Sequence, residues 1–258
     1  MNQTDNKQMK DAPNTDGTLK TKPSQPQQGG FFGNLVFNII IPTLVLSYLS
    51  KPEYLGPAMG IVVALAFPIG YGIKDLISSG KINPFSVLGI ISVSLTGGFS
   101  LMELDPKYIA IKEAAIPAII GLAVLVSNRT QYPLVKTFIL NEQLINIPLL
   151  NSALEAKNNL KAFERKVAQS SMIVAASFFL SATLNYILAK VLLVSPPGTS
   201  AYNEELGKMT ALSYPVIVIP SMIVLFIALW FLFSQMKKLT GQDIETFLND
   251  PQQSDSKP

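Results

Sequence analysis

The sequence predicts an all-α protein, a polytopic transmembrane helical bundle of about six spans with both termini inside. Three observations lead to this fold class. Apolar residues make up 48% of the chain, only 14% of the residues are charged, and the apolar residues gather in long runs. An ordinary soluble domain carries about 25% charged residues. A helix needs about 20 apolar residues to cross the hydrocarbon core of a bilayer.

Six segments meet this length requirement, and we place them at 31–50, 57–75, 84–101, 106–127, 167–194 and 209–236. The third and fourth segments have clear start signals. Asn83–Pro84 and Asp105–Pro106 each place a capping residue before a proline at the first helical position. Aromatic side chains near several segment ends match the interfacial belt of spanning helices.

Lysines and arginines are divided unevenly between the two sides of this predicted bundle. With the N-terminus inside, fifteen of the 20 lie on the inner side. The other five lie on the outer side and are Lys51, Lys107, Lys112, Lys190 and Lys208. Because cytoplasmic loops carry the excess of basic residues, we expect both termini inside.

The chain divides into five predicted regions. Residues 1–30 form a disordered cytoplasmic tail, because so polar a segment cannot bury enough surface to offset its ordering entropy. A four-helix membrane region at 31–127 is followed by a cytoplasmic amphipathic loop at 128–166. A two-helix membrane region at 167–236 precedes a polar cytoplasmic tail at 237–258, in which the apolar residues around Phe247 predict one short amphipathic turn.

The inner loop 128–166 leaves two alternatives open. Apolar residues at helical spacing follow Pro133 and Pro148, which predicts two short helices lying on the inner membrane face. Alternatively, the second helix is the inward extension of the fifth span, and the pattern favours both equally.

Composition excludes several classes of chemistry. The chain contains no cysteine and no histidine, so it has no disulfide, thiol nucleophile, Cys/His zinc site or Ser–His triad. No phosphate-binding or dinucleotide motif is present, and no acidic cluster has metal-ligand spacing. We therefore expect a non-enzymatic protein with no cofactor and no metal. The net charge of +3, without a basic patch, predicts no nucleic-acid partner. The expected partners are the lipid bilayer and other membrane proteins or a second copy of the chain.

Lys112 and Glu113 are the main candidates for a polar membrane site. They lie six and seven residues after Pro106, about 10 Å along the helix, where a charge is costly. Adjacent residues do not face each other on a helix, so we expect Glu113 to pair with Lys190 or Lys208 on another helix. Such a pair would form a site for an ion, a proton or a polar solute. Equally, Lys112 snorkels and Glu113 lies at headgroup level.

Five further residues complete the candidate site. Asp75 ends the second helix, where a carboxylate meets the negative end of the helix dipole, although a loop charge is the commoner explanation. Thr96, Gly97 and Gly98 permit either a helix break or, as we prefer, a tight helix-packing spot. Asn38 is a polar group inside an apolar segment, where hydrogen bonding within the bundle is the usual role.

Prolines recur in the middle of the predicted spans, at Pro42, Pro68, Pro117, Pro215 and Pro220. Transporters often contain broken helices, so Pro42, Pro68, Pro117 and Pro220 are candidate helix-break positions. The simpler explanation, which we prefer, is that proline is common in spanning helices.

Four stretches carry a family resemblance: Asn38-x-x-x-Pro42, FPIGYGIKDLI (67–77), GKINPFSVLGIISVSLTGG (80–98) and IKEAAIPAIIGLAVLVS (111–127). They resemble uncharacterised bacterial inner-membrane proteins loosely related to the intracellular septation protein A family, over about residues 31–166. The resemblance implies a bacterial cytoplasmic-membrane protein linked to cell envelope synthesis or division, and it supplies no catalytic residues. The long N-terminal tail and inner loop depart from the shorter septation proteins.

Two functional hypotheses follow. The first is a non-enzymatic factor linked to the cell envelope or septation, which acts by binding membrane partners. The second is a small secondary transporter or channel for an ion or small solute. A polar cavity that reaches Glu113 would favour transport, whereas a packed bundle without a cavity would favour the first hypothesis.

Overall fold

The structure is a computed structural model that describes residues 33, 35–78, 84–130, 133–140 and 144–249. Within these ranges the chain is all-helical, apart from one isolated antiparallel bridge between Ile145 and Leu248. The predicted all-α class is therefore confirmed. The predicted tail at 1–30 and the predicted cap at Asn83 lie outside the described residues.

Four described helices are long and apolar enough to cross a membrane: Gly56–Lys74, Lys107–Ser127, Leu160–Leu192 and Ser200–Thr240. Two shorter apolar helices cover Val36–Leu49 and Val87–Leu101. Large apolar side chains cover the outside of the long helices, and Ile119, Val191 and Trp230 are 64%, 66% and 72% exposed. Soluble proteins rarely expose so continuous an apolar surface, so these faces are those of a membrane protein.

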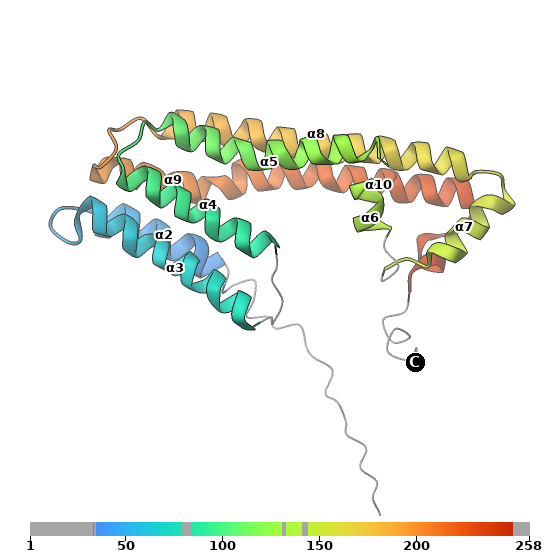
Figure 1. The fold of residues 1–258 in the computed structure, drawn as a ribbon, viewed down its shortest axis with the longest axis horizontal. Helices are drawn as coiled ribbons and strands as arrows, with labels where there is room; N and C mark the ends of the chain where they lie inside the picture. Colours follow the sequence, from blue (N-terminus) through green and yellow to red (C-terminus); the bar gives the residue numbers. More distant parts are fainter. Residues whose placement is uncertain (1–32, 34, 79–83, 131–132, 141–143, 250–258) are drawn as a thin grey trace, which may run out of the picture.

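The long helical segments run back and forth (Figure 1). The first half contains η1 (Val36–Ile40), α2 (Ile41–Leu44), η2 (Val45–Leu49), α3 (Gly56–Ser78), α4 (Pro84–Leu101) and α5 (Lys107–Ser127). The second half contains α6 (Leu134–Ile139), α7 (Ile147–Ala156), α8 (Leu160–Leu192), α9 (Ser200–Ser213), η3 (Tyr214–Val218), α10 (Ile219–Thr240) and η4 (Ile244–Phe247). The segments η1–η2, α3, α4, α5, α8 and the continuous α9–α10 rod each run opposite to the one before, and the short helices α6 and α7 lie between α5 and α8 in the chain.

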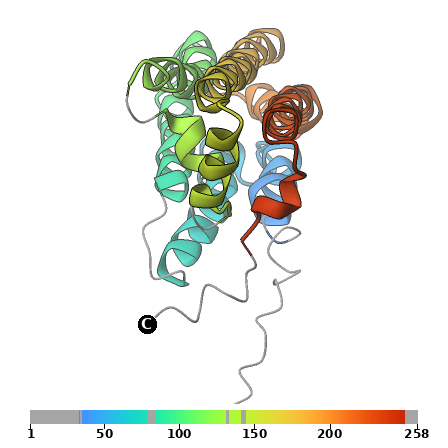
Figure 2. The same ribbon diagram turned by 90° about the vertical axis from the view of Figure 1, so that its right-hand side faces the viewer.

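Helices α5, α8 and α10 form a bundle of long rods, seen end-on in Figure 2. Gly121 lets α5 approach α8 closely, since a Cβ atom there would lie 3.2 Å from the Phe178 Cβ. Two buried hydroxyls join α8 to α10: Ser170 donates to the Ala228 carbonyl and Ser177 to the Ser221 carbonyl, at 3.1 and 2.6 Å. Close packing and interhelical hydrogen bonds are the forces available to helices in lipid, where the hydrophobic effect does not hold them together.

At one end of this bundle, helices α2 and α3 pack against α9, and α4 packs on α3 (Figure 1). Small residues make the contacts. A Cβ at Gly60 of α3 would collide with Ser50, and one at Gly207 of α9 would lie 3.1 Å from the Ser47 Oγ. The buried Asn203 amide donates to the Pro57 carbonyl at 2.8 Å and fixes α9 to the start of α3.

Two predicted helix starts are corrected. The last span begins at Ser200 rather than 209, because the Thr199 hydroxyl caps the helix by accepting the Tyr202 N–H. The fifth begins at Leu160 rather than 167. Both extensions carry charged residues, so an apolar-run criterion does not find them.

The candidate helix breaks are also corrected. α3 and α5 continue through Pro68 and Pro117. Around Pro42 and Pro220 the helix changes between α and π turns without ending. A proline removes one backbone hydrogen bond, but a full break would leave more backbone groups unsatisfied in lipid.

The opposite end of the bundle carries a small packed unit of α7 and η4. Their side chains Leu154 and Phe247 are fully buried with Leu232 and Met236 of α10. The backbone also joins the two segments, since Asn146 N–H donates to the Phe247 carbonyl at 2.8 Å. The segment 128–166 thus combines both alternatives: α7 is a separate helix, and residues 160–166 belong to α8.

Candidate intramembrane polar site

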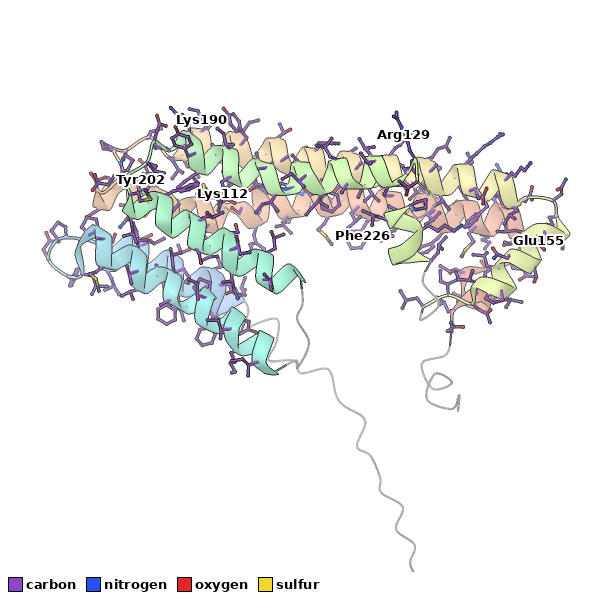
Figure 3. All side chains as sticks on the ribbon, in the orientation of Figure 1. Lys112, Arg129, Glu155, Lys190, Tyr202 and Phe226 are labelled. Atoms are coloured by element: carbon purple, nitrogen blue, oxygen red, sulfur yellow. The ribbon has the colours of Figure 1, made fainter. Side chains whose placement is uncertain are left out.

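Asp105 fixes the start of α5 and so the depth of the residues that follow. Its Oδ1 accepts the Lys107 N–H at 2.9 Å. The helix starts at Lys107 with Pro106 at the N-cap position, one residue later than predicted. Lys112 and Glu113 lie in the second helical turn beyond Asp105, about 10 Å along the helix. Figure 3 labels Lys112 between the first half of α5 and α4.

The Lys112 ammonium is buried, with only 8% of the residue exposed, and it is surrounded by acceptors. Its Nζ donates to the Thr96 Oγ1 at 2.5 Å and to the Ser92 carbonyl at 3.1 Å, both on α4. The Ser92 Oγ lies 3.2 Å away. The Glu113 Oε1 completes the shell at 2.7 Å. An ammonium has three protons to donate, so these contacts satisfy it.

The expected partner of Glu113 was wrong. Glu113 pairs with its chain neighbour Lys112, and Lys208 pairs with Glu204, one helical turn earlier on α9. The rule that adjacent residues do not face each other applies to their Cβ directions. Both side chains are long enough to bend, so their ends meet although their Cβ atoms diverge. The snorkelling alternative for Lys112 is also wrong, because its ammonium lies between α4 and α5.

A groove of about 370 Å³ opens beside this ion pair, between α4, α5 and α8. Its polar lining is Ser92 from α4, Glu113 from α5 and Ser181 with Asn185 from α8. Glu113 is 24% exposed, and Lys112 does not line the groove. The Asn185 amide nitrogen donates to the Ser181 carbonyl at 2.8 Å, which leaves the Oδ1 without a partner among the described residues.

The structure brings some of the other predicted residues to this site. Thr96 holds Lys112 directly. Gly97 lies next to Thr96 and packs against α3, since a Cβ at Gly97 would collide with the Leu65 side chain. This is the tight helix-packing position that we preferred over a helix break. Pro117 lines the groove. Gly98 has open space around it and belongs to the same unbroken helix α4.

Two predicted residues lie elsewhere. Asn38 is half-buried in η1 and is not part of the groove lining. Asp75 lies within the last turn of α3, because the helix continues to Ser78, and its side chain lies outside the described residues.

Sequence reasoning did not assign Ser92 or Phe178 to the site. Ser92 had a detectable signal, since it precedes Thr96 by four residues and therefore lies on the same face of α4. Phe178 had none, because only the packing of α8 against α5 places it at the groove. Among the described residues, no group of three or more acidic side chains could hold a metal ion.

No protein-family model, curated protein or solved structure matches this chain.

Proposed function

We propose that this chain is a multi-pass membrane protein that binds a small solute or ion in the Glu113 groove and moves it through the bilayer, as a small secondary transporter does. One observation carries the proposal: an ion pair about 10 Å along an apolar helix adjoins an open groove of about 370 Å³. Ionisable residues inside membrane spans are rare, and they usually mark substrate or ion pathways.

The proposal includes six crossings with both termini inside a bacterial inner membrane. The two shorter apolar helices, Val36–Leu49 and Val87–Leu101, are added to the four long ones. Each of these six segments runs opposite to the one before it (Figure 1), so six crossings would return the chain to the side from which it started. The fifteen-to-five division of basic residues supports the orientation.

The test measures transport by the purified protein in proteoliposomes. Charge movement is recorded on a solid-supported membrane after jumps in pH or in the concentration of amines, carboxylates, amino acids and monovalent cations. We expect a current with at least one of these, reduced at least about tenfold by Glu113→Gln. The control Glu204→Gln changes an exposed carboxylate and should retain the current. The absence of a current with every one of these solutes would contradict the transport function.

A second candidate is the predicted envelope or septation factor, which binds other membrane proteins. The open side of the groove favours it, because the exposed Gly89 lies there and small residues let another helix approach closely. A photo-crosslinking amino acid at position 89 separates the two functions in cells. Capture of one defined membrane protein supports the envelope factor, whereas labelling of lipid alone supports the transporter.

A further inference from the structure

We infer that the Glu113 groove takes a small organic cation, and that this cation and a proton compete for the Glu113 carboxylate. This inference rests on the proposed function and names the class of its substrate. Four properties of the groove lead to it: the position of Lys112, the hydrogen-bonding groups of the wall, the size of the groove, and the titratable groups around Glu113.

The position of Lys112 decides the sign of the charge that the groove presents. Its ammonium points toward α4, where Thr96 and Ser92 accept its protons, and it does not line the groove. Glu113 contacts Lys112 through Oε1, and Oε2 has no partner among the described residues. A ligand in the groove therefore contacts the Glu113 carboxylate, whereas the Lys112 ammonium lies on the side of that carboxylate away from the groove.

The wall adds further groups that favour a cation. The Asn185 amide nitrogen donates to the Ser181 carbonyl at 2.8 Å and to the Ser181 Oγ at 3.4 Å, so the Oδ1 is the group left to accept a hydrogen bond. Phe178 supplies an aromatic side chain, and aromatic rings attract ammonium groups. An anion would find no cationic side chain in this lining.

The size and the apolar part of the wall indicate an organic rather than an inorganic cation. The groove is open, and its volume of about 370 Å³ is near the lower end of the range for small-molecule sites, which suits a small ligand. Leu88, Ile116 and Ile120 cover much of the surface and can contact alkyl groups. A bare metal cation such as Ca²⁺ would need six to eight oxygen ligands, more than this wall supplies.

Competition with a proton follows from the single carboxylate. Lys112 is the titratable group that faces Glu113, and the groove residues of α4 and α8 carry none. Protonation of Glu113 removes the charge that holds the cation, so the two ligands exclude each other. Exchange of one cation for one proton would then link export of the cation to proton entry.

The experiment is calorimetric titration of the detergent-purified full chain with choline, tetramethylammonium or tetraethylammonium. The control ligand is 3,3-dimethylbutan-1-ol, the uncharged isostere of choline. We expect saturable binding of at least one cation and none of the alcohol. The apparent Kd should rise as the concentration of protons is raised, because the proton and the cation compete for the same carboxylate.

Variants separate charge from folding. Glu113→Gln should weaken cation binding more than tenfold, and Glu204→Gln should not. Phe178→Leu keeps the charge and should weaken binding a few-fold, which tests the site even if Glu113→Gln folds poorly. Absence of cation binding, equal binding of the alcohol, or parental binding by Glu113→Gln would each overturn the inference. If another solute gives a current that depends on Glu113 but no organic cation binds, the proposed transport function stands and this inference is wrong. If a cation binds but no current is recorded, the inference stands and the proposed transport function is wrong.

Discussion

At the scale of the residue, Lys112 and Lys208 form a natural comparison. Each places its Nζ 2.7 Å from a glutamate oxygen. Lys112 is 8% exposed, whereas the side chain of Lys208 is 57% exposed. Breaking a buried ion pair leaves an uncompensated charge and costs about 3–5 kcal/mol. An exposed pair contributes little, because water screens it.

We therefore expect Lys112→Met to lower the melting temperature clearly, since it leaves Glu113, Thr96 and Ser92 without their partner. Lys208→Met should melt like the parent. Both variants exchange a lysine for a methionine of similar length, so lost side-chain volume does not account for a difference. The measurement is the melting temperature of the purified parent and of both variants. Equal melting temperatures for the two variants would contradict the buried ion pair.

Asp105 gives a pH-dependent contribution at the same scale. The hydrogen bond from the Lys107 N–H, and then the Lys107 ammonium, hold the pKa of Asp105 below its ordinary value of 3.8. A carboxyl group with a lowered folded-state pKa adds stability above its unfolded pKa. That stability is lost as the pH falls through the folded pKa.

We expect Asp105→Ala to lower the melting temperature slightly at neutral pH, and the difference from the parent to shrink below the ordinary pKa. Asp105→Asn keeps a capping oxygen and should stay closer to the parent at neutral pH. Melting curves across the acid range measure this. A difference that is constant with pH would rule out the carboxylate as the cause.

The sequence indicated Lys112 and Glu113 because burying a charged side chain within an apolar membrane helix costs free energy in whichever direction the side chain points. Their mutual pairing was not predictable from Cβ directions, since the flexible ends of the two side chains decide it. Ser92 was detectable from its spacing to Thr96, whereas Phe178 and Asn185 could not be assigned to the groove, because that requires knowing how α8 packs on α5.

At the scale of the element, glycine positions separate close packing from open space. At Gly60 an added Cβ would meet the Cβ and the backbone of Ser50, neither of which can rotate away. At Gly98 it would meet nothing within 4 Å. Overpacking costs about 1–3 kcal/mol, and alanine is favoured over glycine in a helix by about 0.5–1 kcal/mol.

Gly60→Ala should therefore lower the melting temperature, and Gly98→Ala should leave it unchanged or raise it. Both glycines lie in apolar helices and receive the same methyl group, so each controls for the other. If Gly60→Ala were as stable as Gly98→Ala, the close approach of α3 to Ser50 would be wrong.

Helix positions were predictable where an apolar run coincided with a whole helix, as for 84–101, whose limits match α4. They were missed where a helix continues beyond the apolar run. The start of α8 contains Lys161, Glu164, Arg165 and Lys166, and α9 contains Glu204, Glu205 and Lys208. At about 1.5 Å per residue, the 33 residues of α8 are about 50 Å long, so part of the helix lies beyond a hydrocarbon core of about 30 Å.

At the scale of the whole molecule, the two ends of the bundle differ in construction. One end is formed by short connections, including the loop at 50–55, and by the start of α9. The other carries the packed unit of α7 and η4, which Figure 1 places beside the ends of α8 and α10. More of the described basic residues lie toward the second end, with Lys157, Lys161 and Lys237 among them. Figure 3 shows Arg129 between the middle of the bundle and this end.

The final prediction concerns which end faces the cytoplasm. Positive charges are retained on the inner side, so the α7–η4 end should lie inside and the loop at 50–55 outside. The chain has no cysteine, so a single introduced cysteine reports its own position. Asn151 is exposed on α7, whereas its neighbour Leu150 is 1% exposed and would not react. Glu53 is exposed in the opposite loop.

In intact cells, we expect an impermeant maleimide to label Glu53→Cys and to spare Asn151→Cys until the membrane is opened. Labelling of both positions after permeabilisation shows that both thiols are reachable in the folded protein. Labelling of Asn151→Cys from outside would reverse the orientation. Labelling of both from outside would place the two ends on the same side, and the lengthwise crossing of α5, α8 and α10 would then be wrong.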